Sequence, residues 1–206
     1  MDELSLREFN ALLASSAPTP GGGGVAALAA ALGAGLGIMV GSLTVGKKKY
    51  AANDEELQKL MNEAKELQSR ALELINSDAE EFQKLMAVYA LPKDAPDRDA
   101  KIEAALVSAA AAPMEVVRLC VKEAELTARF AQLGSALMLS DAGCAAVLCA
   151  SAIKAAALNV YANTKLMRDR STAEKMNREV KETLERSVLL TEKIYENVAE
   201  KLILTE

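Results

Sequence analysis

The chain contains no histidine and no tryptophan among its 206 residues, and aromatic residues make up only 3% of it. Without histidine the protein cannot carry a Ser–His–Asp triad, a histidine-ligated zinc site or an imidazole general base. The scarcity of aromatic residues, together with abundant alanine and leucine, disfavours β-strands. Because 51% of the residues are hydrophobic, the chain can build a sizeable core. We therefore predict a folded, all-α protein.

Cysteine is also scarce, and the 29 acidic residues outnumber the 24 lysines and arginines. Cys120, Cys144 and Cys149 lie in apolar segments without metal-site spacing, so we expect small buried thiols, no metal and a reducing, cytoplasmic compartment. The net charge of −5 argues against a nucleic-acid partner, because phosphate binding needs a basic surface. The N-terminus, Met1–Glu3, is acidic rather than basic, which disfavours a secretory signal.

One long segment lacks charge altogether. Phe9–Gly46 contains no charged residue, and Gly33, Gly37 and Gly41 repeat within it at a spacing that lets two helices approach closely. A transmembrane helix dimer is one interpretation. However, alanine and glycine favour insertion into lipid only weakly, and the other segments are amphipathic and need a protein core to pack against. We predict instead a fully buried helix, with no membrane partner. Its flat glycine face places it near the subunit contact of a soluble homodimer.

Capping and helix-breaking residues divide the chain into long packed helices of one multihelical domain, residues 1–206, with no linker. The first helix is expected to start at a capping box in residues 5–8, the apolar helix to end near Gly46, and the third helix to run from Asn53 to about Leu91. The fourth helix should be kinked at Pro113 and end at Gly134, and the fifth should be capped by Ser140 or Asp141 and reach Leu166. The last helix should start at a capping box in residues 171–174. Segments 24–28 and 143–147 are alike, which reflects either an internal duplication or a shared alanine-rich composition.

The predicted helix after Asn53 carries one carboxylate on its apolar face. Apolar residues recur there every three or four positions, and Asp78 occupies the position that this stripe demands between Leu74 and Phe82. A carboxylate aimed at a core is destabilising unless it is paired, hydrogen-bonded or neutral. Three interpretations stay open: a buried ion pair, a cap for a neighbouring helix, and a catalytic acid/base whose pKa is set by partial burial.

Other polar groups are candidates for ligand binding. Asn159 and Asn163 lie one helical turn apart, where their amides either read the edge of a heterocycle or join buried helices. The glycine run Gly21–Gly24 precedes a helix N-terminus, whose free N–H groups suit an anion or a carbonyl. Lys47–Lys49 form either an anion-binding or a solvated cluster, and Asp141 is most simply an N-cap.

Five groups of motifs follow one another along nearly the whole chain: Pro20-Gly21-Gly22-Gly23 with Val25-Ala26-Ala27, Leu43-Thr44 with Gly46-Lys47-Lys48-Lys49-Tyr50, Asp78-Ala79-Glu80 with Phe82, Leu91-Pro92-Lys93, and Ser140-Asp141 with Ala145-Ala146. In this order they resemble the cyclodeaminase domain of formiminotransferase-cyclodeaminase and its stand-alone bacterial relatives, which include methenyltetrahydrofolate cyclohydrolases. The chain departs from the family pattern at Gly24, where serine is common, and at Ser135, where asparagine is usual.

This resemblance implies a multihelical homodimer that acts on a tetrahydrofolate derivative without a metal or redox cofactor, with Asp78 as the catalytic residue. The residues expected to contact the substrate are Pro20, Gly21, Gly22, Gly23, Lys47, Lys48, Asp141, Asn159 and Asn163. The favoured reaction converts 5-formiminotetrahydrofolate into 5,10-methenyltetrahydrofolate and ammonia. The alternative reaction opens 5,10-methenyltetrahydrofolate to 10-formyltetrahydrofolate. A helical scaffold or a membrane-associated dimer is the non-enzymatic alternative.

Overall fold

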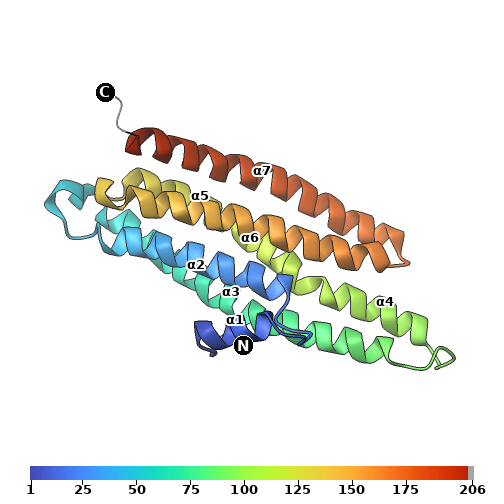
Figure 1. Cartoon of the computed structure of the whole chain (residues 1–206). Helices are drawn as coiled ribbons and strands as arrows, with labels where there is room; N and C mark the ends of the chain where they lie inside the picture. Colours follow the sequence, from blue (N-terminus) through green and yellow to red (C-terminus); the bar gives the residue numbers. More distant parts are fainter. Residues whose placement is uncertain (204–206) are drawn as a thin grey trace.

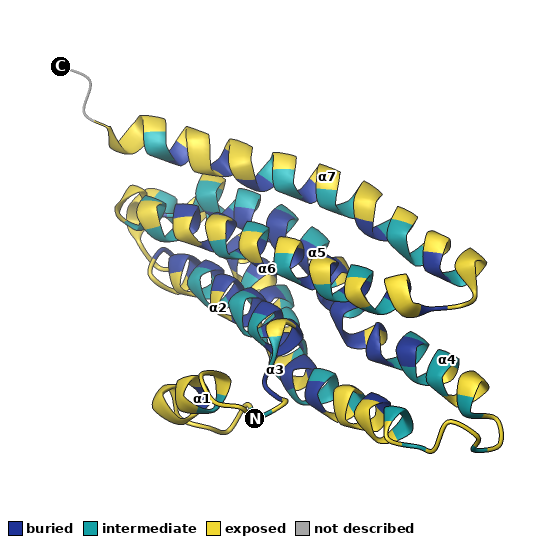
Figure 2. Ribbon diagram, turned by 45° about the vertical axis from the view of Figure 1, so that its right-hand side comes forward, coloured by how far each residue is buried: buried dark blue, intermediate teal, exposed yellow. Residues whose placement is uncertain are grey.

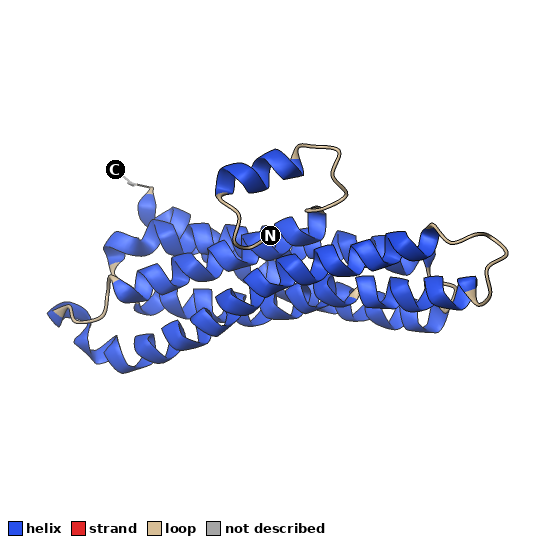
Figure 3. Ribbon diagram, turned by 90° about the horizontal axis from the view of Figure 1, so that it is seen from below, coloured by secondary structure: helices blue, strands red, loops and turns tan. Residues whose placement is uncertain are grey.

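The computed structural model describes residues 1–203, which form helices and loops without a strand (Figures 1 and 3). The α-helices of these residues are α1 (Leu6–Leu13), α2 (Gly22–Ser42), α3 (Asp54–Tyr89), α4 (Arg98–Ala109), α5 (Ala111–Leu133), α6 (Leu139–Leu166) and α7 (Arg170–Leu202), and two 3-10 helices, η1 (Lys48–Asn53) and η2 (Ala136–Met138), lie between them. The predicted all-α fold is confirmed for the described residues.

Helices α2 and α6 form the centre of the bundle. They pack against each other, and α3 and α5 also contact α2 while α5 and α7 contact α6 (Figure 1). Burial follows this arrangement, since α7 and the ends of α3 show exposed outer faces whereas α2, α5 and α6 carry most of the buried positions (Figure 2). Helix α1 lies outside the bundle, and Phe9 is its one buried residue. The two apolar helices of the suggested duplication are therefore neighbours, although the duplication itself stays a hypothesis.

The glycine face of α2 is covered by the same chain, which corrects the expectation that it forms a flat outer surface. A Cβ added at Gly33 would overlap the Glu123 carboxyl of α5, and one at Gly37 would lie 2.9 Å from the Phe130 ring. The small residues let α5 approach α2 closely, as small residues do in tightly packed helix pairs. Helix α2 is also not fully buried, because Leu32 is 49% exposed on its opposite face.

Several helix ends differ from the predicted ones. Helix α2 stops at Ser42, four residues early, and Gly46 adopts a positive φ of 81° in the following turn. Helix α6 starts at Leu139 with no side-chain cap, so the prediction that Asp141 is an N-cap was wrong. Asp141 still lies in the first turn, where a carboxylate interacts favourably with the helix dipole. Helix α7 is capped by Asp169, whose side chain accepts a hydrogen bond from the Thr172 N–H at 3.1 Å.

Other predicted boundaries are confirmed. The capping box of α1 is present, with the Glu8 N–H donating to Ser5 Oγ at 3.2 Å and the Ser5 N–H donating to Glu8 Oε2 at 2.9 Å. The predicted kink near Pro113 occurs as a break at Ala110, between α4 and α5. Proline removes one helical donor and crowds the carbonyl four residues earlier, which accounts for a break on its N-terminal side.

Three stretches are long and apolar enough to cross a membrane by length and composition: Gly22–Ser42, Arg98–Leu133 and Ala136–Leu166. Within the folded chain 56%, 50% and 39% of their most apolar windows are buried. The absence of a membrane partner therefore stays a prediction.

Candidate active site

Asp78 faces the N-terminus of α2. It lies on α3 one turn after Leu74, is half-buried, and accepts a hydrogen bond from the backbone N–H of Gly24 in the first turn of α2. No cation pairs with this carboxylate among residues 1–203. Of the three interpretations of Asp78, the structure therefore shows the helix-capping contact and no ion pair. The Asp78 carboxyl also opens into a cleft, so it remains available for acid/base chemistry.

The glycine run lets two polar side chains reach the α2 backbone. A Cβ on Gly23 would overlap the carboxylate of Asp78, and a Cβ on Gly22 would lie only 3.0 Å from Asn159 Nδ2. Any side chain at position 23 would therefore push Asp78 away from the helix N-terminus. Glycine is needed here for close approach and not for flexibility.

Burial raises the pKa of Asp78 above its ordinary value, and this effect exceeds the opposite one of the Gly24 hydrogen bond, which favours the charged form. A carboxyl whose pKa moves toward neutrality exchanges a proton more readily near neutral pH. The environment of Asp78 thus suits a group that both accepts and donates a proton.

Asp78 opens into a cleft of about 380 Å³ between the start of α2, the C-terminal half of α3 and the end of α6. This Asp78 cleft has polar groups on Asp78, Gly21–Gly23, Asn159 and Asn163. Its remaining lining is largely apolar and comes from Pro18, Thr19, Phe82, Leu85, Met86, Tyr89, Ala109, Ala162 and Leu166. Apolar walls with a few convergent polar groups are the usual composition of a small-molecule site.

Phe82 and its neighbours show what the sequence pattern missed. Phe82 was expected in the core, yet it is 36% exposed and lines the Asp78 cleft. Met86 and Tyr89 continue the same face of α3 at spacings of four and three residues. The helical spacing of Asp78, Phe82, Met86 and Tyr89 could therefore have predicted that these residues share one face of α3. Where this face extends beyond the packed core, it lines the cleft.

The expected substrate-binding residues fall into two groups. Gly21, Gly22, Gly23, Asn159 and Asn163 line the cleft together with the Asp78 carboxyl. Pro20 is buried beside this glycine run and does not line the cleft.

The second group lies at the opposite end of the bundle. Lys47 and Lys48 are exposed beyond the C-terminus of α2, a helix whose length from Gly22 to Ser42 is about 30 Å. Asp141 lies in the first turn of α6, about 27 Å along the helix from Asn159. The structure therefore does not bring these three side chains to the Asp78 cleft of the same chain.

Two motif residues at this opposite end contact the segment before α6. Thr44 Oγ1 donates to the Val40 carbonyl at 2.7 Å and accepts from the Ser135 N–H at 2.8 Å. The Tyr50 hydroxyl accepts from the Ala136 N–H at 3.1 Å. The motif at residues 43–50 and the segment before α6 thus form one structural unit, in which Ser135 uses its backbone.

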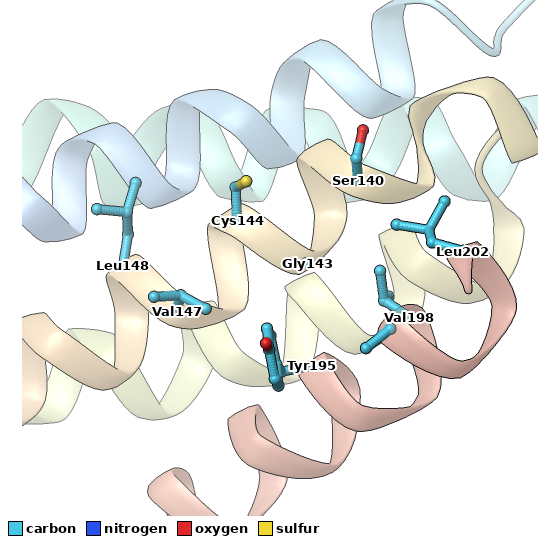
Figure 4. A pocket seen from close by; sticks show the side chains of 9 residues that line it. Ser140, Gly143, Cys144, Val147, Leu148, Tyr195, Val198 and Leu202 are labelled. Atoms are coloured by element: carbon cyan, nitrogen blue, oxygen red, sulfur yellow. The ribbon is translucent and has the colours of Figure 1, made fainter.

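A second, larger cavity of about 560 Å³ lies between the start of α6 and the end of α7 (Figure 4). Its lining is apolar apart from Ser140, Cys144 and the Tyr195 hydroxyl (Figure 4). Cys144 is exposed there, which corrects its expected burial. With no carboxylate, lysine or arginine in its lining, this cavity offers less acid/base chemistry than the Asp78 cleft.

The core holds one group of metal-ligating atoms that the spacing did not predict. The side-chain ligand atoms of Cys120, Glu123 and Cys149 lie within 4.8 Å of one another, and all three residues are buried. The Cys149 thiol donates to the Cys120 carbonyl at 3.3 Å, whereas Glu123 Oε1 has no hydrogen-bond partner. Burial raises the pKa of Glu123 well above its ordinary value, so the neutral acid is favoured.

Comparisons with known proteins agree with the motif order. The family described as Formiminotransferase-cyclodeaminase matches residues 5–182. A protein of Methylorubrum extorquens named Methenyltetrahydrofolate cyclohydrolase is 40% identical, over 92% of this chain and 93% of that protein. The rat Formimidoyltransferase-cyclodeaminase is 29% identical over 89% of this chain, but the match covers only 35% of the longer rat protein.

The fold has a close counterpart among solved structures. The formiminotetrahydrofolate cyclodeaminase from Thermotoga maritima superposes with a TM-score of 0.84 at 28% identity, covering 96% of this chain and 98% of that one. The chain therefore belongs to the formiminotransferase-cyclodeaminase family.

Proposed function

We propose that the chain opens 5,10-methenyltetrahydrofolate by hydrolysis to 10-formyltetrahydrofolate. The observation that carries this proposal is the half-buried Asp78 carboxyl, which opens into a cleft with apolar walls and has a raised pKa. The 40% identical M. extorquens relative, matched almost from end to end, bears the name of this activity. The motifs alone favoured the cyclodeaminase reaction, and this relative moves the cyclohydrolase reaction ahead.

The chemistry needs one group that accepts a proton and then returns it. Water adds to the methenyl carbon between N5 and N10, and the Asp78 carboxylate takes a proton from it as the C–O bond forms. The protonated Asp78 then delivers this proton to N5 as the N5–C bond breaks. The hydroxyl of the tetrahedral adduct loses its proton to solvent and becomes the formyl carbonyl on N10. A carboxyl with a raised pKa serves both steps.

The cyclodeaminase reaction is a second candidate, favoured by the likeness to the T. maritima structure. N10 of the substrate attacks the carbon of the protonated formimino group, and Asp78 takes the N10 proton. The same proton passes to the departing nitrogen, which leaves as ammonia and forms the methenyl product. Both candidates thus use one carboxyl at a tetrahedral carbon.

The two candidates are tested in parallel assays of the purified chain. One assay follows the loss of methenyl absorbance from 5,10-methenyltetrahydrofolate, and the other follows ammonia release from 5-formiminotetrahydrofolate. We expect turnover in the first assay above the uncatalysed rate. Ammonia release alone would favour the second candidate, and no turnover in either assay would overturn the proposed function.

The homodimer expected from the family resemblance is part of this proposal. The C-terminal half of α2 and its C-cap expose an apolar face, with Leu32, Met39 and Leu43 between 39% and 49% exposed. These residues recur at spacings of seven and four, so they form one stripe, and no charged residue interrupts it. A second copy that packs its α2 on this stripe would remove it from water.

Such a dimer accounts for the two separated groups of motif residues. If the two α2 helices pair antiparallel about their middle, as a two-fold axis allows, the C-terminal end of one helix lies beside the N-terminal end of its partner. Lys47 and Lys48 of one subunit would then approach the Asp78 cleft of the other. There their charges suit the carboxylates of a folate glutamate tail.

Charge reversal tests this placement of the lysines. We expect Lys47→Glu and Lys48→Glu to raise KM for polyglutamylated substrate at least tenfold, and to raise it less for monoglutamylated substrate, since each added carboxylate interacts with the changed charge. Steady-state kinetics with both substrates measure the difference, with Lys181→Glu at an exposed position of α7 as the control. An equal rise for both substrates would argue for a solvated cluster.

A further inference from the structure

The amides of Asn159 and Asn163 have a defined orientation on α6. Asn159 Nδ2 donates to the Ala155 carbonyl at 2.9 Å, and Asn163 Nδ2 donates to the Asn159 carbonyl at 2.9 Å. A carbonyl only accepts hydrogen bonds, so the amino end of each amide must face the helix backbone. The oxygen of each amide therefore has no backbone partner, and one N–H of each amino group also remains.

Both side chains belong to the Asp78 cleft. Asn159 and Asn163 line it, and within residues 1–203 neither Oδ1 accepts a hydrogen bond from the protein. Residues four apart on a helix lie about 5–6 Å from each other. The end of α6 thus presents two hydrogen-bond acceptors to any ligand in the cleft.

The next polar groups along the cleft are donors. Asn159 packs against Gly22, because a Cβ there would lie 3.0 Å from Asn159 Nδ2. Gly22 and Gly23 occupy the first turn of α2, where backbone N–H groups have no partner within the helix. The carboxylate of Asp78 follows beside Gly23 and accepts from Gly24. The order in space is therefore Asn163, Asn159, the α2 N–H groups, and Asp78.

The edge of a 2-amino-4-oxopteridine ring presents the complementary series. Going round the ring, the 2-amino group and N3–H are donors, O4 is an acceptor, and N5 follows two bonds beyond the carbonyl carbon. Each group of the ring thus meets a protein group of the opposite kind, in the same order. A ring placed this way brings N5 to the carboxyl that must exchange a proton with it.

Resting on the proposed function, we infer that Asn163 and Asn159 accept hydrogen bonds from the 2-amino group and N3–H of the substrate's pterin ring, with O4 on the first turn of α2. The two asparagines are specificity-determining residues, because they select a ring with donors at these two positions. They also orient the ring so that N5, and not the opposite edge, faces Asp78.

The test measures binding and needs no turnover. Pterin and lumazine differ at C2, where the amino donor of pterin is replaced by an oxo acceptor. We expect the chain to bind pterin at least tenfold more tightly than lumazine in a calorimetric or competition assay. An equal affinity for the two rings would overturn the inference without any variant.

Two substitutions at position 163 separate an acceptor from a merely structural side chain. Asn163→Leu removes the acceptor and is expected to abolish the preference for pterin. Asn163→Asp keeps an acceptor but cannot donate to the Asn159 carbonyl, and it is expected to retain the preference. Asn62→Leu, at an exposed position of α3, is the matched control and should leave the ratio unchanged.

The outcomes also separate this inference from the proposed function. If Asn163→Leu folds and keeps the preference while the wild-type chain turns over methenyl substrate, the inference fails and the function stands. If the wild-type chain shows the pterin preference but no turnover, the ring orientation stands and the reaction assignment fails.

Discussion

At the scale of single residues, Asp78 both caps a helix and carries a carboxyl suited to acid/base chemistry. Its carboxylate caps α2 through the Gly24 N–H, and its half-burial raises the pKa. The cap holds the carboxyl in place at the cleft, while partial desolvation moves its proton affinity toward the range that acid/base catalysis needs. Gly23 makes both possible by leaving room for the carboxylate.

Replacing Asp78 by asparagine should separate catalysis from stability. Asp78→Asn keeps the shape and an acceptor for Gly24 but exchanges no proton, so we expect kcat to fall by about 100-fold or more. KM should change much less, because the lost interaction belongs to the transition state. Because burial raises the pKa of Asp78, the carboxyl destabilises the fold as the pH rises through that pKa, and the variant should therefore melt at least as high as wild type at pH 8. Near-normal turnover would refute the catalytic assignment.

A methyl group at position 23 should have a similar effect on activity through geometry. The Cβ of Gly23→Ala would overlap the Asp78 carboxylate and displace it, so we expect turnover to fall at least tenfold. Gly35→Ala in the same helix is the control, since its Cβ meets only the flexible end of Gln68, 2.8 Å away. Equal activity of the two variants would show that the position of Asp78 relative to α2 is not critical.

At the scale of elements, α2 is a helix of small residues around which the others pack. Its inner face accepts Phe130 and Glu123 of α5 against glycines, and its outer face exposes leucine and methionine. In this close packing the carboxyl of Glu123 lies in the core, and its Oε1 has no hydrogen-bond partner within the described residues. Such an orphaned polar atom lowers stability by about 1–3 kcal/mol.

The burial of Glu123 predicts a pH-dependent stability. Its pKa is raised well above the ordinary value of 4.5, so the folded chain holds this proton more tightly than the unfolded chain does. Stability is then full below pH 4.5 and falls as the pH rises toward the folded-state pKa. We expect Glu123→Gln to raise the free energy of unfolding at pH 8, where the carboxyl is driven to ionise, and to change it less at pH 5. Denaturant titration at both pH values, with Glu182→Gln at an exposed position of α7 as the control, checks this. A loss of stability at pH 8 would show that the carboxyl has a partner.

At the scale of the whole molecule, the motif residues lie at two ends of an elongated bundle. The Asp78 cleft occupies one end, and the unit of residues 43–50 with the start of α6 occupies the other. Because α2 and α6 are continuous helices of 21 and 28 residues, the two ends of one chain cannot meet. A two-fold dimer is the simplest assembly that joins them.

The dimer proposal predicts the effect of a charge on the outer stripe of α2. Leu32→Glu places a carboxylate on that stripe, at the middle of α2, so we expect the chain to become a monomer in light scattering at micromolar concentration. Leu189→Glu, at an even more exposed leucine of α7, should remain a dimer. A monomeric wild-type chain, or a Leu32→Glu variant that stays dimeric, would remove the proposal.

Prediction from the sequence succeeded most clearly for α2, α3 and Asp78. The scarcity of aromatic residues, the lack of charge in residues 9–46 and the three-to-four spacing of apolar residues were enough to predict helices and to single out Asp78. These patterns depend only on neighbours within a few turns. Helix caps were less predictable, since Met138 and Asp169 took positions that Asp141 and Ser171 were expected to hold. Which residue caps a helix depends on where packing against other helices ends the regular backbone.

The sequence by itself determined the helical class, the family and the one carboxylate that lies on an apolar stripe. Only the tertiary structure decided that Asn159 joins Asp78 and the glycine run, whereas Lys47 and Asp141 do not. Asp78 and Asn159, 81 positions apart, become neighbours only through helix packing, which a local pattern does not encode. Residues near in sequence are held apart for a related reason, because a helix is rigid and moves the chain 1.5 Å per residue.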